Sequence, residues 1–405
     1  MSWENVELQD VSEYRTERIE TNLLNDKNYV STENMLSDKG GIIDSSYPPS
    51  GNNSPAFRPN DTLVSNIRPY FKKIWFAQNE GGCSNDVIVF KPYEEKIDPK
   101  FLYFQLSKDE FFDYMMSGAN GTKMPRGNKK AIPKFKFLMP TSIETQKRIA
   151  SILSSYDDLI ENNLKRIKLL EETAQNIYKE WFVNFRFPNY EHTEFDAESG
   201  LPVGWKILAL NDIYKKLESG SRPKGGIDKD LKDGIPSIGA ESIRELGYFD
   251  FSKTKFVSND FFEKMNKGKI EDRDILIYKD GAYIGKTTLF QDDFPYSNCA
   301  VNEHVFLLNT KNKLHQYYLF FTLSTKEYYS KMQNLNSNAA QPGINQPKLL
   351  QLELLMTNND DLLISFNAKV EPLVKQIYSL AKINKNLKEA RDILLPRLMN
   401  RTIEV

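Results

Sequence analysis

The residues that most invite a chemical interpretation are 279–287 (KDGAYIGKT), a stretch with two glycines followed by lysine and threonine. A Walker A loop, which cradles nucleotide phosphates, has four residues between its glycines, whereas three lie between Gly281 and Gly285. The helix that should follow such a loop is replaced by a run rich in β-forming residues, 287–290. We therefore predict a tight turn between strands here and no nucleotide site.

Other catalytic signatures are incomplete. A base methyltransferase carries Asn or Asp followed by two prolines and an aromatic residue, which neither 46–50 (SYPPS) nor 293–296 (DFPY) provides. The charged run 94–96 (EEK) is better explained as an exposed turn than as part of a nuclease site. The three histidines have no metal-binding spacing, and no Gly-x-Ser-x-Gly elbow occurs. The sequence thus predicts no catalytic residue and no metal site, which favours a binding protein.

Composition narrows the class of protein further. A chain of 405 residues is long enough to bury at least two cores, so two or three domains are expected. No stretch approaches the roughly 18 apolar residues that span a membrane. Two cysteines, Cys83 and Cys299, are too few for a disulfide scaffold and are expected to be plain buried thiols. We therefore expect a cytoplasmic protein.

Charge is informative locally, because the formal net charge of the whole chain is only −1. Residues 114–143 contain no Asp or Glu, and a positive stripe of this kind suits phosphate binding. The basic residues of the stripe are Lys123, Arg126, Lys129, Lys130, Lys134 and Lys136. A merely solvated loop is the alternative interpretation.

Two loops at equivalent positions are the candidate reading surfaces, 118–130 and 334–346. Asn, Gln, Arg and Lys side chains pair with base edges, and Gly permits close backbone approach, although structural turns would also account for the Asn and Gly. The candidate DNA-contacting residues of the first loop are Asn120, Thr122, Lys123, Arg126, Asn128 and Lys129. Those of the second loop are Asn338, Gln341, Asn345 and Gln346. Further candidates in the second repeat are Arg222, Lys224, Lys279, Tyr283 and Lys286.

An internal repeat makes these loops equivalent. Residues 101–107 (FLYFQLS) match 318–324 (YLFFTLS) at an offset of 217, and this register continues without a gap for about forty residues. Upstream, 61–64 matches 274–277 and Ser84-Asn85 matches Ser297-Asn298 at an offset of 213, and Trp3 matches Trp205 at 202. The increase of the offset from 202 to 217 along the chain indicates extra loop residues in the second copy. The chain is therefore predicted to contain two globular units in tandem, each followed by a long helix.

Each long helix carries the heptad pattern of a coiled coil. The first is expected to begin after a cap at Thr141 or Ser142, and no Gly or Pro follows before Pro188. Its seam residues alternate spacings of four and three: Ile149, Leu153, Tyr156, Ile160, Asn163, Ile167, Leu170, Ala174, Ile177 and Trp181. Adding 217 gives the second seam: Phe366, Val370, Leu373, Ile377, Leu380, Asn384, Leu387, Arg391, Leu394 and Leu398. Pro372 predicts a late start or a kink in the second helix.

The asparagines in the seams predict the direction of pairing. Parallel pairing at the repeat offset sets Asn163 against Leu380, whereas antiparallel pairing centred midway along the seam sets Asn163 against Asn384. A buried amide without a partner costs about 1–3 kcal/mol, so we predict an antiparallel coiled coil whose register the two amides specify. Such a rod, roughly 48 Å long, would hold the globular units at opposite ends. A helical spacer without a measuring role is the alternative.

The order of several short motifs is similar to that of a known family. These are 144–150 (ETQKRIA), 184–188 (NFRFP), 200–205 (GLPVGW), 274–281 (DILIYKDG), 340–342 (AQP) and 391–398 (RDILLPRL). Over essentially its whole length the chain resembles the specificity subunits of Type I restriction-modification systems. One departure is that the first loop has Lys-Met-Pro-Arg where the second has Ala-Gln-Pro-Gly.

The resemblance implies a mixed α/β fold with two target-recognition domains, each reading half of a split sequence in double-stranded DNA. It also implies two docked methyltransferase subunits and outer restriction/translocase subunits. S-adenosylmethionine, ATP and Mg²⁺ would belong to these partners, and this chain would bind no cofactor. The expected segments are a first domain at 1–143, a helix at 144–185, a linker at 186–204, a second domain at 205–358 and a helix at 359–405.

Two other functions stay open at this point. The chain could be an adaptor whose two heads bind protein, with the coiled coil as a spacer; salt-sensitive binding to duplex DNA would argue against that function. It could also be an enzyme with an unrecognised site, which strand cleavage or methyl transfer by the isolated chain would reveal.

Overall fold

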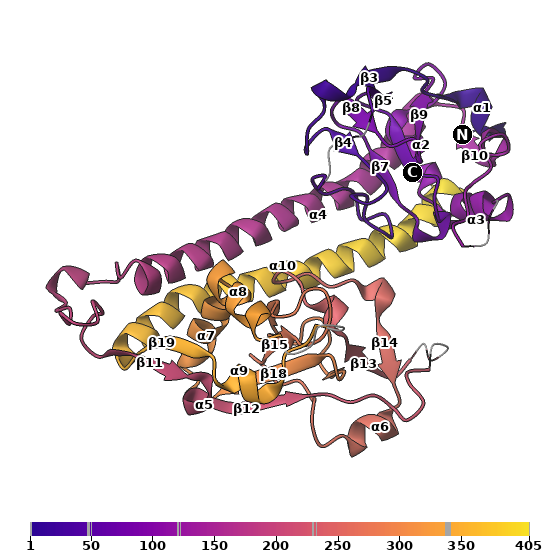
Figure 1. Ribbon diagram of the computed structural model, residues 1–405. Helices are drawn as coiled ribbons and strands as arrows, with labels where there is room; N and C mark the ends of the chain where they lie inside the picture. The colour runs from indigo at the N-terminus through magenta and orange to yellow at the C-terminus, as the bar shows by residue number, and fades with distance from the viewer. Residues whose placement is uncertain are drawn as a thin grey trace. The chain divides into compact units, whose positions relative to one another are not determined.

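The sequence repeat corresponds to two sets of short strands in the computed structural model (Figure 1). The structure describes residues 2–46, 49, 51–119, 121, 123–228, 231, 233–336 and 342–404. The first set of strands is β1 Trp3–Glu7, β2 Ser12–Tyr14, β3 Arg18–Glu20, β4 Tyr29–Val30, β5 Asn53–Phe57, β6 Thr62–Ser65, β7 Ile74–Phe76, β8 Gly81–Cys83, β9 Val87–Pro92 and β10 Lys136–Pro140. The second set is β11 Trp205–Ala209, β12 Tyr214–Ser219, β13 Ile235–Ile238, β14 Lys255–Val257, β15 Ile275–Tyr278, β16 Thr287–Leu289, β17 Ala300–Val301, β18 Val305–Thr310 and β19 Glu353–Thr357.

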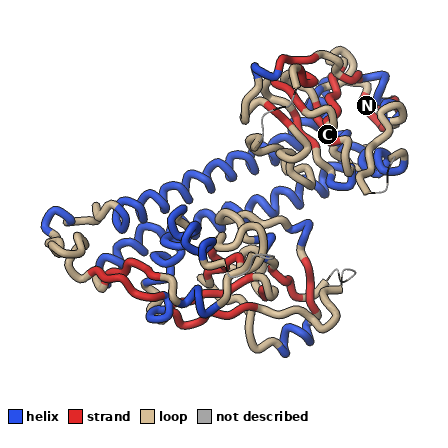
Figure 2. Tube along the Cα trace, viewed as in Figure 1, coloured by secondary structure: helices blue, strands red, loops and turns tan. Residues whose placement is uncertain are grey.

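Short helices accompany each set of strands, and a long helix follows each set. The helices up to the middle of the chain are α1 Leu8–Val11, α2 Pro99–Leu106, α3 Asp109–Ser117 and α4 Ile143–Tyr178. Those after it are α5 Leu210–Ile213, α6 Asn259–Lys264, α7 His315–Leu323, α8 Lys326–Asn334, α9 Gln346–Leu350 and α10 Asp360–Met399. Helices and strands therefore mix within each repeat, which confirms the predicted mixed α/β fold (Figure 2).

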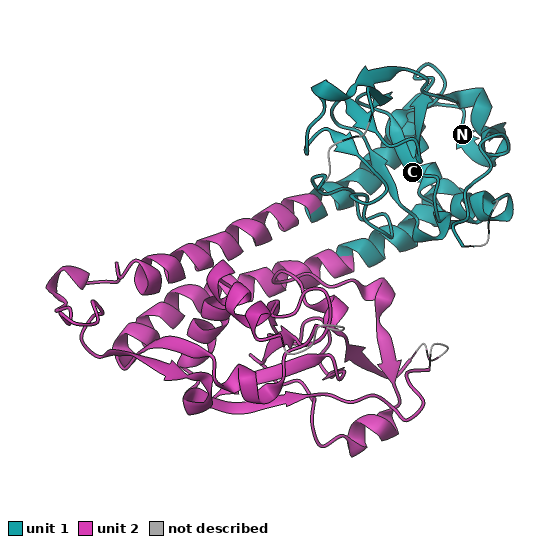
Figure 3. Cartoon of the chain, in the orientation of Figure 1, with its two compact units in different colours: residues 1–160, 387–405 teal, residues 161–386 magenta. Residues whose placement is uncertain are grey.

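The chain folds into two compact units, each of which contains part of both long helices (Figure 3). Unit 1 comprises residues 1–160 and 387–405, and unit 2 comprises residues 161–386. The units therefore differ from a linear division into head, helix, head and helix. The physical reason is that the apolar stripe of each long helix is buried against strands and helices of both repeats, as the two cores described below show.

The two heads share one strand order. One of the two four-stranded sheets of unit 1 has the order β2-β9-β6-β7, and the four-stranded sheet of unit 2 has the order β12-β18-β15-β16. A separate antiparallel pair closes each head, with Trp3 opposite Pro140 in unit 1 and Trp205 opposite Thr357 in unit 2. These positions differ by the predicted offsets of 202 and 217, so the repeat is confirmed at both ends of each head.

One part of the predicted repeat alignment is wrong. The backbone N–H of Ser84 donates to Val30 at 2.9 Å, and the equivalent bond in unit 2 runs from Asn302 to Ile238 at 3.0 Å. The matching offset is thus 218, and Ser84-Asn85 corresponds to Asn302-Glu303 instead of Ser297-Asn298. The reason is the longer connection between β16 and β17, which places the extra residues of the second copy before this position.

The core of unit 1 lies between its sheets, α2, α3 and the long helices. Phe101 and Phe111 from the short helices are fully buried, together with Leu153 of α4 and Leu398 of α10. The aromatic rings interlock edge to face, as the Phe90 and Phe111 rings do at 6.1 Å. Segments from the start of α4 and the end of α10 therefore complete the core of unit 1.

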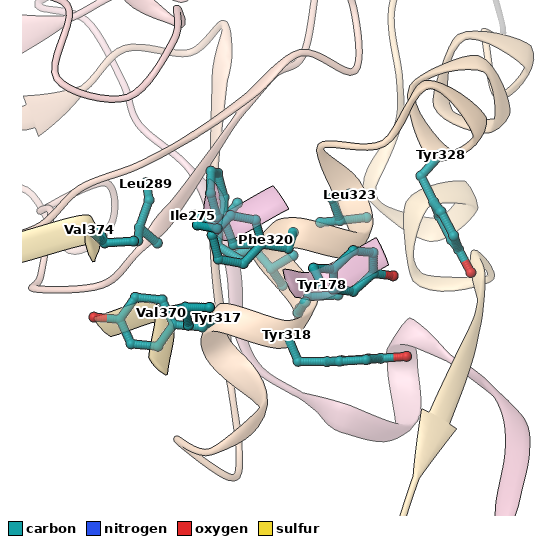
Figure 4. Close-up of a cluster of buried hydrophobic side chains, with 14 of the residues drawn as sticks. Tyr178, Ile275, Leu289, Tyr317, Tyr318, Phe320, Leu323, Tyr328, Val370 and Val374 are labelled. Carbon is teal, nitrogen blue, oxygen red and sulfur yellow. The ribbon is translucent and has the colours of Figure 1, made fainter. Parts of the chain in front are cut away.

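The core of unit 2 is built in the same way (Figure 4). Tyr178 of α4 lies against Tyr318 of α7, with ring centroids 5.8 Å apart, and its hydroxyl bonds to Thr322 at 2.9 Å. Val370 and Val374 of α10 are fully buried in the same cluster. The end of α4 and the start of α10 therefore complete this core. Cys83 in unit 1 and Cys299 in unit 2 are free and buried, as predicted.

The long helices differ slightly from their predicted bounds. Ser142 caps α4 through its side chain, as predicted, and the helix ends in a π-helical turn, Lys179–Val183, instead of reaching residue 185. Helix α10 begins at Asp360 and runs unbroken through Pro372, so the predicted late start is wrong. It ends at Met399 and not at 405, because the N–H groups of residues 402 and 403 fold back onto the Arg397 carbonyl.

The predicted pairing of the two seams is confirmed within unit 2. The Asn163 side-chain amide donates to the side-chain oxygen of Asn384 at 2.9 Å, and both residues are buried. The remaining nitrogen of Asn384 has no hydrogen-bond partner among the described residues. Ile167 of α4 and Leu380 of α10 are buried in one cluster on the same side of this amide pair, and an antiparallel order sets these two seam positions opposite each other.

The seam in unit 1 contains a buried ion pair. Arg391 occupies a seam position of α10, where it is 8% exposed. Its guanidinium bonds to Asp157 of α4 at 2.5 Å and to Asp392 at 2.9 Å. A buried guanidinium is tolerated because these two carboxylates compensate its charge.

Unit 2 contains a half-buried carboxyl group on α4. Glu171 accepts a hydrogen bond from the backbone N–H of Leu246 at 3.5 Å and lines a cavity of about 220 Å³ with Lys286 and Lys326. Burial, with smaller contributions from Glu245 and Glu172, raises the pKa of Glu171 to about 7. This carboxyl group therefore binds its proton more tightly than a fully solvated glutamate does.

The amide pair leads to a prediction about stability. Replacing Asn163 with Leu leaves the Asn384 oxygen buried without a partner, so the free energy of unfolding should fall by about 1–3 kcal/mol. Replacing both with Leu should recover most of that loss while loosening the register. Urea unfolding of the single and double variants measures this, with the exposed neighbour Asn162→Leu as control. An Asn163→Leu variant as stable as the control would contradict the role of the pair.

Glu171 leads to a prediction about pH. Its folded-state pKa lies above the unfolded value of 4.5, so the folded chain holds the proton more tightly and stability should fall as pH rises from about 4.5 to 7. The difference of about 2.5 units corresponds to roughly 3 kcal/mol at most. Glu171→Gln should remove this decline, whereas Glu172→Gln, which alters an exposed neighbour, should keep it. Identical pH profiles of unfolding free energy in all three proteins would refute this assignment.

Candidate nucleic-acid interface

In unit 1 the first candidate loop is anchored to the sheet by backbone hydrogen bonds. The N–H of Arg68 donates to the carbonyl of Pro125 at 2.7 Å, and the N–H of Gly127 donates to that of Asn66 at 3.1 Å. These bonds bracket Arg126, which forms an isolated β-bridge with Ile67. The backbone of the loop is thus fixed at Arg126, although the side chain of this residue is 52% exposed.

The second candidate loop is anchored in the same way in unit 2. The N–H of Gly281 donates to the carbonyl of Pro342 at 3.0 Å, and the N–H of Ile344 donates to that of Lys279 at 3.0 Å. The bridge here joins Asp280 and Gly343. Each anchor therefore holds the loop at the position that matches Arg126, and the residue there in unit 2 is a glycine.

The stretch 279–287 is the turn between two strands, as predicted. β15 and β16 are antiparallel, with Ile277 opposite Thr287, and the N–H of Gly285 donates to the Tyr278 carbonyl at 2.8 Å. Tyr283 at the tip is 56% exposed, and the Lys286 ammonium lies 5.0 Å from its ring centroid. The turn presents an aromatic face and a cation, but no helix follows it to form a phosphate cradle.

Three of the predicted amide side chains have partners within the protein. The Asn128 oxygen accepts from the Lys130 N–H at 3.0 Å, and the Asn345 oxygen caps α9 by accepting from the Lys348 N–H at 2.9 Å. The Gln346 amide donates to the Leu217 carbonyl at 3.0 Å. These contacts shape the loops.

The predicted basic residues fall into two groups. Lys123 and Lys224 are exposed. Lys129 and Lys279 contact the backbone of the segment that precedes β9 in unit 1 and β18 in unit 2. The Lys129 ammonium donates to the carbonyl of Asn85 at 3.4 Å, and that of Lys279 donates to the carbonyl of Glu303 at 3.0 Å. Four other predicted residues lie outside the described part of the chain: Asn120, Thr122, Asn338 and Gln341.

Acidic and histidine residues of this preceding segment were missed by the sequence analysis. In unit 1, Asp86 accepts from the Nε of Arg126 at 3.3 Å. In unit 2, Glu303 pairs with the Nε of Arg222 at 3.1 Å, and His304 lies 3.3 Å from Asp280. These residues could have been found from the sequence, because both segments directly precede apolar strands. They were missed because Ser84-Asn85 was aligned with the wrong residues of the second repeat.

Unit 2 also has a cavity beside these residues. It has a volume of about 390 Å³, and Arg222, Thr254, Asn302 and His304 are among its lining residues. Across the described residues, no three His, Cys, Asp or Glu side chains gather closely enough to hold a metal ion. None of the helices in the described ranges combines the length and apolar character needed to cross a membrane.

Relatives of the chain include two named specificity subunits. The Type I restriction enzyme MjaIX specificity subunit of Methanocaldococcus jannaschii is 26% identical over 323 residues, which cover 74% of this chain and 68% of that protein. The Type I restriction enzyme HindI specificity subunit of Haemophilus influenzae is 22% identical over 463 residues, which cover 98% of this chain and 99% of that protein. Both similarities extend over at least two thirds of each protein.

Similarity of fold and the match to a family model complete the comparison. The crystal structure of a Type I restriction-modification S subunit from M. genitalium is similar with a TM-score of 0.58 and 16% identity, covering 98% of this chain and 96% of that one. The family model described as Type I restriction modification DNA specificity domain matches residues 1–172 and 202–355. Because these two segments make up most of the sequence, the chain belongs to the family of Type I restriction-modification DNA specificity proteins.

Proposed function

We propose that this chain is the non-catalytic specificity subunit of a Type I restriction-modification complex and reads a bipartite DNA sequence, one half-site with each head. One observation carries this proposal: both heads anchor a loop at the same place by the same pair of backbone hydrogen bonds, yet present different side chains there. Two readers of different half-sites need a common scaffold with different contacts.

The partners follow from the family and from the surface of the long helices. In unit 2, Leu164 and Leu169 of α4 and Ile383 of α10 are 45–61% exposed on helices whose seam is already buried. Apolar side chains in such positions suit protein contacts, and we assign them to docking of two methyltransferase subunits. Restriction/translocase subunits would join outside these, and the complex would act in the cytoplasm.

Catalysis and cofactors are assigned to these partners. S-adenosylmethionine would serve the methyltransferase subunits, and ATP and Mg²⁺ would serve the restriction subunits. The side chains near the anchored loops are amides, arginines, lysines and a histidine–carboxylate group, which suit hydrogen bonds to bases and phosphates. The adaptor function, in which both heads bind protein, is not favoured by the family match.

The proposal predicts a split methylation motif that depends on this chain. Methylated bases are mapped across the genome of a host that expresses the chain with its cognate methyltransferase, and in a host that lacks only this chain. Two short sequence blocks around a fixed unspecified gap should be methylated only when the chain is present. A stable, active complex without such a motif would overturn the proposal. In that case, the absence of salt-sensitive binding to duplex DNA would favour the adaptor function.

A further inference from the structure

Two exposed arginines, one in each head, each contact a carboxylate through their Nε atom. The Nε of Arg126 bonds to Asp86 at 3.3 Å, and the Nε of Arg222 pairs with Glu303 at 3.1 Å. Their side chains are 52% and 63% exposed. Among the described residues, no hydrogen bond from a terminal Nη nitrogen of either arginine is found. The two terminal nitrogens of each guanidinium, which form a fork of four N–H groups, therefore have no hydrogen-bond partner among the described residues.

Other arginines with carboxylate partners in the described ranges use their terminal nitrogens. Arg15 bonds to Asp61 and Glu17 through Nε and both Nη groups, and Arg58 contacts Glu17 through Nη2 at 2.7 Å. Arg273 contacts Glu371 through Nη2 at 2.6 Å. In these cases the fork is occupied within the protein. Arg126 and Arg222 are thus the arginines that a carboxylate orients while leaving the fork available.

The two carboxylates lie at neighbouring positions of the matching segments, since Asp86 aligns with His304 and Glu303 aligns with Asn85. Asp86 directly precedes β9, and Glu303 lies two residues before β18, which is the matching strand of the second sheet. The arginines come from different segments, because the residue that matches Arg126 in unit 2 is Gly343. Different chain segments therefore bring an arginine to the segment that precedes β9 in unit 1 and β18 in unit 2.

Arg222 is positioned by a close backbone approach. The N–H of Gly220 donates to the Asn302 carbonyl at 3.2 Å. A Cβ at Gly220 would lie 1.6 Å from the Val301 oxygen, so only glycine fits there. The segment that follows β12 is thereby held against the residue next to Glu303. Arg222 is consequently fixed at its backbone as well as at its Nε.

The chemistry of this arrangement favours a DNA base over a DNA phosphate as the ligand of each guanidinium. A guanidinium fork donates two parallel hydrogen bonds to O6 and N7 of guanine in the major groove, the commonest specific contact of arginine with DNA. The carboxylate at Nε restricts rotation of the fork, which reduces the entropy lost on binding. It also neutralises the charge of the arginine, which weakens attraction to phosphate but leaves the terminal donors intact.

We propose that Arg126 and Arg222 each read a guanine in the half-site of its own head, with Asp86 and Glu303 as positioning residues. This inference depends on the proposed function, because it names the base that each head recognises. Each half-site therefore contains at least one G·C pair in contact with its arginine. The two heads use different arginine positions to meet the same base.

The test is the methylation motif of the complete complex with Arg126→Lys. A lysine keeps the charge but lacks the fork, so discrimination at one G·C position of one half-site should fall roughly 5- to 150-fold. The half-site of the other head serves as an internal control and should stay unchanged. Arg222→Lys should relax one G·C position in the half-site of unit 2 and leave the half-site of unit 1 unchanged. Arg58→Lys, a similarly exposed arginine with an occupied fork, should alter neither half-site.

The positioning residues supply a second readout. Asp86→Asn should relax the same single position as Arg126→Lys, and Glu303→Gln the same position as Arg222→Lys. A purely structural role would instead lower the yield or stability of the complex without changing one base of the motif. Thermal unfolding of each variant complex separates these results. Relaxation at a different position, or at several positions, would contradict the positioning role.

Other outcomes would overturn the inference while leaving the proposed function intact. One is a half-site without any G·C pair, and another is an unchanged motif in both lysine variants. A third is uniformly weaker binding to all sequences with a salt slope reduced by about 1, which identifies a phosphate contact. Failure of the proposed function itself would look different, because the native complex would then show no bipartite motif at all.

Discussion

Burial of the apolar stripes of the two long helices is the constraint on which the rest of this structure depends. Neither head completes its core alone: unit 1 buries Leu153 of α4 and Leu398 of α10, and unit 2 buries Tyr178 of α4 and Phe366 of α10. The helices are thus part of both cores and cannot be exchanged for a flexible linker. Hydrophobic burial supplies the stability, and it ties the pairing of the helices to the folding of the heads.

Polar groups inside the seams specify the register in which the two helices pair, which apolar packing alone does not. Leucine and isoleucine side chains tolerate a shift of register at modest cost, whereas a buried amide or guanidinium does not. The Asn163–Asn384 bond in unit 2 and the Arg391–Asp157 pair in unit 1 each require one alignment of the helix segments that carry them. The unpartnered nitrogen of Asn384 indicates that this specificity has a cost in stability.

The heads separate a constant framework from variable contacts. The bonds that anchor the two loops are made by backbone groups, which any residue except proline as donor supplies. Side chains at the anchor are consequently free to differ, and they do: Arg126 in one head corresponds to Gly343 in the other. Carboxylates beside the loops, Asp86 and Glu303, then orient whichever arginine each head provides. Sequence recognition can change in such a scaffold without a change of fold.

The sequence by itself determined the repeat, the two seams and the pairing of Asn163 with Asn384. These features depend on spacing along the chain, and a heptad period or a 217-residue offset is visible without coordinates. It also correctly predicted the turn at 279–287, because missing spacing and a missing helix are local properties. The mixed α/β fold was expected from the resemblance to a known family and not from spacing along the chain.

Only the tertiary structure decided which side chains meet across the heads. The pairs Arg126–Asp86 and Arg222–Glu303 join residues from separate segments, and the length of the β16–β17 connection shifts their alignment from 213 to 218. Loop length changes at little energetic cost, so no local pattern records it. For the same reason the sequence predicted linear domains, whereas the burial of both helices in both cores is a property of the folded chain.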